Sequence, residues 1–186
     1  MKMDRLRDEC SIKGKNGIAF LLAATILWLC FVIVYLQPFD LRFKNVIVLM
    51  MTALLFPLSW GISMMIKAEW LQKKHPFSEL GLILNYAQLA YLPLVIWAFL
   101  QMPEKMIAMF AVITGAHLFP YGWFYRARGY YVMAFVIAIS MMMMGWVVSP
   151  VQLWIIPIVM AFFLIILILW LWVDYKKKSA SVSFDD

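Results

Sequence analysis

Among the uncharged polar residues within the long apolar stretches of this sequence, four lie at comparable depth: Ser59, Asn85, Gln88 and His117. At about 1.5 Å of helical rise per residue, each lies about 9–13 Å from a charged residue near the end of its stretch. We call these four residues the polar layer; Tyr121 follows His117 by one helical turn. Such side chains donate and accept hydrogen bonds without a fixed charge, and they predict a site for a small neutral or amphipathic molecule.

Two interpretations of the polar layer stay open. Polar side chains also join membrane helices to one another at about 0.6–2 kcal/mol per hydrogen bond, with no ligand involved. Asn85 and Gln88 are three residues apart and share a helix face. Acid–base catalysis by His117 normally needs a second placed group, and the apolar stretches contain no carboxylate. We therefore favour a protein that is not an enzyme, and the same absence argues against ion-coupled transport.

The elements that carry these residues follow from composition and charge. The sequence is 66% hydrophobic and 14% charged, against about half and about a quarter in soluble domains. Its uncharged stretches reach or exceed the roughly 20 residues that cross a bilayer. They predict an all-α integral membrane protein with a single compact bundle of six transmembrane helices at 18–36, 45–66, 80–100, 105–125, 130–148 and 151–173.

The basic residues predict the orientation of these helices. Thirteen of the 16 Lys and Arg residues fall on the side of the two termini, so the positive-inside rule places both termini in the cytoplasm. We expect a cytoplasmic segment at 1–16, a transmembrane domain at 17–173 and a cytoplasmic tail at 174–186, disordered from 179. The protein would be a multi-pass plasma-membrane protein whose charge of +6 favours anionic lipids over nucleic acid.

A proline-centred hexapeptide occurs twice, as LFPLSW at 55–60 and LFPYGW at 118–123. Pro57 and Pro120 each remove a backbone donor and bend a helix. Chance and internal duplication both remain possible origins of the pair. Because the two helices would run in the same direction, we expect the bends to splay them apart beside the polar layer.

Two further signals concern partners. Arg126 and Arg128 lie in an aromatic run at 125–131, which is typical of an interface anchor and compatible with a phospholipid head-group site. Ala19 and Ala23 form a small-residue pair that favours close helix packing, within the chain or in a homo- or hetero-oligomer.

Neither a metal nor another cofactor is expected. The consecutive methionines 141–144 point to four faces of a helix, so they cannot form one copper site. His75 and His117 fall in a loop and a helix, with no carboxylate near His117, which disfavours zinc or haem. Cys10 and Cys30 are too far apart for a disulfide.

Two segments carry a resemblance: SIKGKNGI at Ser11–Ile18 and HLFPYGWFYRARGYY at His117–Tyr131. They resemble a family of small uncharacterised bacterial six-helix integral membrane proteins, a domain of unknown function. The resemblance implies a six-helix fold and a bacterial plasma membrane, and it transfers no catalytic residues. Size and helix count are also similar to the substrate-binding subunits of energy-coupling-factor vitamin transporters, which take substrate from the outer side. Here the outer loops are short and the polar layer lies toward the inside.

Three functional classes follow. The first is binding or passive translocation of a small neutral or amphipathic ligand at the polar layer. The second is a non-catalytic partner subunit of a membrane complex. The third is a lipid-modifying enzyme with His117 as base and Arg126 and Arg128 on a phosphate. We favour the first class.

Overall fold

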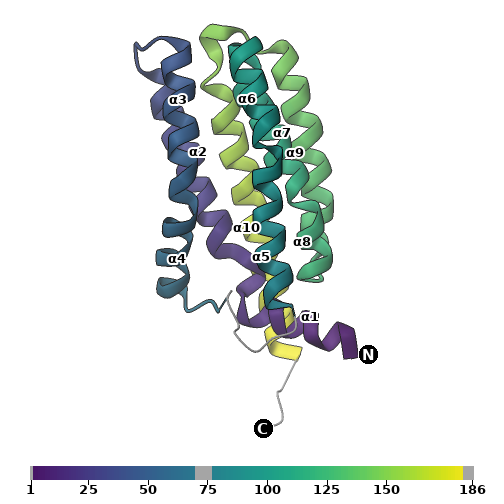
Figure 1. The fold of residues 1–186 in the computed structure, drawn as a ribbon. Coiled ribbons are helices and arrows are strands. Elements are labelled where there is room, and N and C mark those ends of the chain that lie inside the picture. The colour runs from purple at the N-terminus through teal and green to yellow at the C-terminus, as the bar shows by residue number, and fades with distance from the viewer. Residues whose placement is uncertain (1, 70–76, 182–186) are drawn as a thin grey trace.

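The computed structural model describes residues 2–69 and 77–181, which form an all-helical bundle (Figure 1). Within these residues, six stretches are long and apolar enough to cross a membrane, as predicted. We refer to them in chain order as the first to sixth spans: Lys15–Leu36, Leu41–Ile66, Glu79–Gln101, Pro103–Phe124, Arg128–Val147 and Ile155–Ser181. His75 and two of the basic loop residues used for orientation, Lys73 and Lys74, lie outside the described residues.

The first, fifth and sixth spans contain one long α-helix each, whereas the second, third and fourth are each interrupted and contain two. The helices are α1 (Lys2–Lys13), α2 (Ile18–Leu36), α3 (Leu41–Met51), α4 (Leu55–Ile66), α5 (Ser78–Ala87), α6 (Leu92–Gln101), α7 (Met106–His117), α8 (Phe119–Phe124), α9 (Arg128–Val147) and α10 (Ile155–Ser181). A 3₁₀ turn joins α3 to α4 and another joins α5 to α6, while α7 and α8 meet at Leu118.

Four spans form the core, and two lie at its edge. Helices α2, α7, α9 and α10 pack against one another through buried side chains such as Phe31, Ile107, Met141 and Leu164. More than half of the first and fourth spans is buried, against less than a fifth of the second and third. The second span packs on α2 and the third on α7. These two peripheral spans have no substantial packed interface with each other, and a gap separates their ribbons in Figure 1.

The first and last described residues, at the start of α1 and the end of α10, lie at one end of the bundle, which we call the terminal end. Helix α1 lies across it and packs against the last part of α10, at the bottom of Figure 1. The opposite end, which we call the far end, holds the turns at 37–40, 102–105 and 148–154. There Asn45 donates from Nδ2 to the carbonyl of Pro103 at 2.8 Å and ties the second span to the loop before the fourth.

The C-terminal segment is helical where disorder was expected. Helix α10 continues to Ser181, so the prediction of disorder from Ser179 is wrong for its first three residues. Lys178 holds this part of the helix against the bundle, because its Nζ donates to the carbonyls of Tyr125 and Arg126 at 2.9 and 3.0 Å. A helix can therefore continue beyond its apolar stretch when a charged side chain such as that of Lys178 binds to groups on the protein.

Candidate functional site

A two-lobed cavity lies between the peripheral spans. Its wide lobe has a volume of about 270 Å³ and is lined by the first four spans, with Trp28, Phe31, Val95 and Phe110 among the apolar side chains. A narrow lobe of about 80 Å³ extends toward the terminal end. The lobes adjoin, because both are lined by Ala24, Leu55, Asn85, Gln88 and Thr114.

The polar groups of the cavity gather in and beside the narrow lobe. Tyr121 donates from its hydroxyl to Oδ1 of Asn85 at 3.0 Å, and the same hydroxyl lies 3.4 Å from Nε2 of His117. The Asn85 amide donates in turn to the carbonyl of Gly81 at 2.9 Å. This cluster joins the third span to the fourth. It combines neutral donors and acceptors at the border of a mainly apolar cavity, which is the usual composition of a small-molecule site.

Breaks in the peripheral and fourth spans place these residues. Gln88 begins the 3₁₀ turn Gln88–Tyr91, and His117 is the last residue of α7. Pro120 lies in the first turn of α8. A backbone N–H at this place would have no acceptor within the helix, so proline, which lacks the N–H, fits there. Pro93 lies at the start of α6 in the same way. Polar side chains therefore stand next to irregular backbone inside the membrane-spanning region, where the backbone needs partners other than its own helix.

Gln88 is a polar side chain of the cavity that is free to bind a ligand. It lines both lobes, and its amide has no hydrogen bond within the described part of the chain. Thr114 also lines both lobes and donates to the carbonyl of Phe110 at 2.8 Å, so its hydroxyl oxygen can still accept a hydrogen bond. A ligand in the cavity would meet one free amide and several acceptors.

The polar layer is only partly assembled at this cavity. Asn85, Gln88, His117 and Tyr121 line it, whereas Ser59 lines neither lobe. Ser59 is fully buried and donates to the carbonyl of Phe56 on its own helix at 2.8 Å. Sequence reasoning missed Thr114, although its position three residues before His117 places both on one face of α7.

The other predicted site residues lie elsewhere. Arg126 and Arg128 line a separate cavity at the terminal end. Ala19 and Ala23 are buried in the core of the chain itself, as expected for packing within the bundle, and association between copies through them stays a prediction. In the part of the chain that the structure describes, no His, Cys, Asp and Glu side chains group as metal ligands would.

The Cys10 thiol, at the terminal end, is also unsuited to chemistry. Burial, together with the neighbouring charge of Glu9, raises the pKa of the thiol from 9.0 to about 11. The thiolate is the reactive form of cysteine, so Cys10 is a structural residue at neutral pH.

A comparison with family models matches most of the chain. The model described as "Family of unknown function (DUF7010)" covers residues 3–174 of 186. The matched range contains Ser11–Ile18 and His117–Tyr131, the two segments on which the resemblance rests, and the expectation of an uncharacterised family is confirmed. No curated protein and no solved structure matches the chain.

Proposed function

The chain belongs to this family of unknown function, and from that premise we propose that it binds a small, uncharged amphipathic molecule in the two-lobed cavity. The observation that carries the proposal is the Asn85–Tyr121–His117 cluster beside the unpaired amide of Gln88. The polar part of the ligand would lie against these groups, and its apolar part would occupy the wide lobe.

The composition of the lining supports a neutral ligand. None of the described lining residues of either lobe is Asp, Glu, Lys or Arg. A charged group placed there would lose its hydration without gaining a counter-charge, which is costly in a low-dielectric region. The same described lining has no carboxylate to carry ion coupling, so we infer that translocation of the ligand through this cavity would be passive.

The arrangement of the peripheral spans supports entry from the lipid. The second and third spans both line the cavity without a substantial interface between them. A molecule dissolved in the bilayer could pass between them without crossing the packed core of α2, α7, α9 and α10. An amphipathic ligand, which concentrates in the membrane, fits this route better than a strongly polar solute.

The test uses 1-octanoylglycerol as an uncharged amphipathic probe and octanoate as its charged counterpart. We expect the glyceride to raise the thermal unfolding midpoint of the purified protein in a concentration-dependent manner, because a ligand that binds the folded state stabilises it. Gln88→Leu should weaken the response about three- to tenfold, since one net hydrogen bond contributes about 0.5–1.5 kcal/mol.

Gln101→Leu is the matched control, because Gln101 is exposed at the far end and lines neither lobe. Its response should equal that of the parent. Equal responses of the Gln88 variant and the parent, or a stronger effect of octanoate than of the glyceride, would contradict the proposal.

A further inference from the structure

A second cavity, at the terminal end, is lined by cationic side chains. It has a volume of about 520 Å³ and brings together Arg7, Arg126, Arg128 and Lys178, with Asp8 and Tyr131 also in its wall. It shares no lining residue with the two-lobed cavity. These cations come from α1, the turn before α9, the start of α9 and the end of α10.

Two of the cations are fixed in place by the protein. The Nε of Arg7 donates to the carbonyl of Trp123 at 2.7 Å, and its guanidinium lies 4.6 Å from the centre of the Trp123 ring. Lys178 donates to the carbonyls of Tyr125 and Arg126 at 2.9 and 3.0 Å. Fixed cations recognise an anion at a lower entropic cost than freely moving ones do.

The charges of the site do not balance. Three cations have a carboxylate partner: Arg126 pairs with Asp8 at 2.7 Å, Lys178 with Asp174 at 2.7 Å and Arg7 with Asp4 at 3.5 Å. Arg128 is exposed and has no ion pair or hydrogen bond within the described residues. It is also the first residue of α9, whose preceding residue, Ala127, provides no side-chain cap. One positive charge beside a helix N-terminus is therefore left for an anion.

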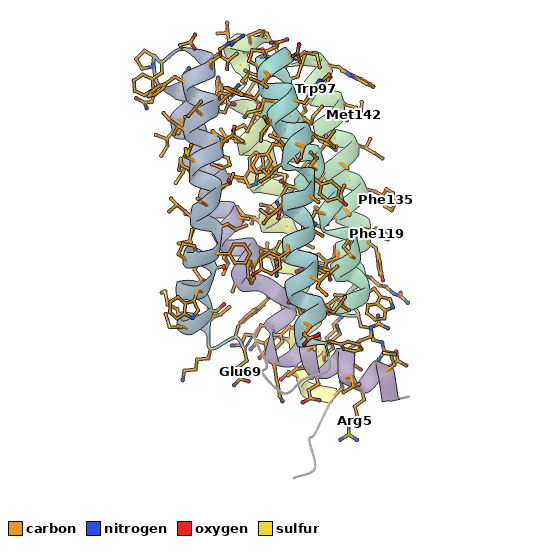
Figure 2. The ribbon with its side chains drawn as sticks, in the orientation of Figure 1. Arg5, Glu69, Trp97, Phe119, Phe135 and Met142 are labelled. Atoms are coloured by element: carbon orange, nitrogen blue, oxygen red, sulfur yellow. The ribbon has the colours of Figure 1, made fainter. Side chains whose placement is uncertain are left out.

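An aromatic strip leads from this cavity along the outside of the bundle. The Tyr131 ring, in the cavity wall, lies 5.0 Å from that of Phe119, which lies 5.5 Å from that of Phe135. Phe119 and Phe135 are exposed, and Figure 2 shows both pointing outward from one side of the bundle. A ligand with an anionic head and an apolar tail would contact the cations and the strip together.

We propose that this cavity binds the phosphate-bearing head group of an anionic membrane lipid, with an acyl chain along the Tyr131–Phe119–Phe135 strip. Guanidinium groups match phosphate oxygens in pairs, which favours phosphate over a single-point anion. Tryptophan and tyrosine beside the cavity are typical of the membrane–water interface, where the head group lies. A free phosphate would use the cations and leave the strip uncovered.

The experiment titrates the purified full chain, in a neutral detergent at constant ionic strength, with dioctanoyl phosphatidylglycerol, dioctanoyl phosphatidylcholine or inorganic phosphate. The readout is the thermal unfolding midpoint. We expect phosphatidylglycerol to stabilise the protein more than phosphatidylcholine does. Arg128→Gln should weaken this effect about ten- to a hundredfold, because a hydrogen bond to a charged group contributes about 1.5–3 kcal/mol.

Arg5→Gln is the matched control. It removes the same charge from α1, where Arg5 is exposed and points away from the bundle in Figure 2. Phe135→Ala separates the two sources of phosphate, since it should weaken the response to phosphatidylglycerol and leave any response to inorganic phosphate unchanged.

A response to inorganic phosphate alone, or equal responses to the two lipids, would overturn the lipid assignment. Equal losses in the Arg128 and Arg5 variants would overturn the site itself, because they would reflect net charge only. Failure of the two-lobed cavity to bind a glyceride leaves these outcomes unaffected.

Discussion

At the scale of single residues, Asn16 is the most constrained side chain at the terminal end. It is fully buried and has a left-handed backbone with φ of 53°. Its amide donates to the carbonyl of Leu171 and to Oδ2 of Asp174, both at 3.0 Å, and its side-chain oxygen accepts from Ser11. Its own carbonyl accepts from the Tyr130 hydroxyl at 2.6 Å. Asparagine meets both demands, because it tolerates this backbone and fills these bonds.

We expect Asn16→Ala to lower the free energy of unfolding by about 2–4 kcal/mol, because it leaves buried acceptors without a donor and puts alanine in a left-handed conformation. Asn16→Gly should lower it by about 1 kcal/mol less, since glycine adopts that backbone freely. Unfolding in mixed detergent and SDS measures both changes. An alanine variant within about 0.5 kcal/mol of the parent would show that the network contributes little.

At the scale of elements, three consecutive spans are broken near a proline. A 3₁₀ turn at Thr52–Leu54 precedes Pro57 in α4, the turn Gln88–Tyr91 precedes Pro93, and the break at Leu118 precedes Pro120. Residues at all three breaks line the cavity. Proline keeps the preceding backbone from continuing a regular helix, and Gln88 and His117 lie at or next to two of these breaks.

We predict that Pro57→Ala and Pro120→Ala let each span continue more regularly through its break, leave stability unchanged or slightly higher, and reduce the response to 1-octanoylglycerol by narrowing the cavity. Pro150→Ala is the control, because Pro150 is exposed in a far-end turn and lines neither lobe. The three variants should be compared by thermal unfolding with and without the probe. Folded variants of Pro57 and Pro120 that respond like the parent would assign the repeated hexapeptide to packing alone.

The sequence predicts the positions of the membrane spans better than it predicts which side chains meet at the site. The length of the apolar stretches alone located the six spans. The first residue of each span in the structure differs from the predicted first residue by at most four positions. The second span begins earlier than predicted, at Leu41, because Asp40 caps it through the backbone N–H of Arg42 and Lys44 reaches back to the carbonyl of Tyr35. Charged side chains at span ends find partners that a hydropathy window does not represent.

The sequence predicts how deep a residue lies in the membrane. Which neighbouring helix its side chain faces depends on how the spans pack. The contact between Tyr121 and Asn85 joins two residues whose predicted depths were similar. Ser59 has a similar predicted depth and yet bonds within its own helix, because α4 packs on α2 rather than on the third span. Helix α1 was also not predicted, since a mixed-charge segment has no apolar stretch to mark it.

At the scale of the whole molecule, the distribution of basic residues gives the bundle two different ends. The cavity of Arg7, Arg126, Arg128 and Lys178 lies at the terminal end. We propose that this end faces the cytoplasm, in keeping with the positive-inside rule. The lipid-binding proposal fits this orientation, because anionic lipids enrich the cytoplasmic leaflet.

Labelling intact cells with a membrane-impermeant maleimide tests the orientation. Val151→Cys, at an exposed far-end position, should react on intact cells. Ser179→Cys, exposed near the end of α10, should react only after the membrane is permeabilised. The parent chain supplies the baseline, since Cys10 is buried and Cys30 lies within the first span. The reverse pattern would place the terminal end outside the cell.

The order of synthesis determines when the hydrogen bonds of Asn16 can form. Its side-chain partners Leu171 and Asp174 follow it by 155 and 158 residues, and Tyr130 follows it by 114. A ribosome adding about 5–20 residues per second makes the last of these roughly 8–30 s after Asn16. During that interval the first span is already available to the membrane, while the groups that fix its entry turn do not yet exist. The turn that begins the first span can therefore form its complete set of hydrogen bonds only after most of the sixth span has been made.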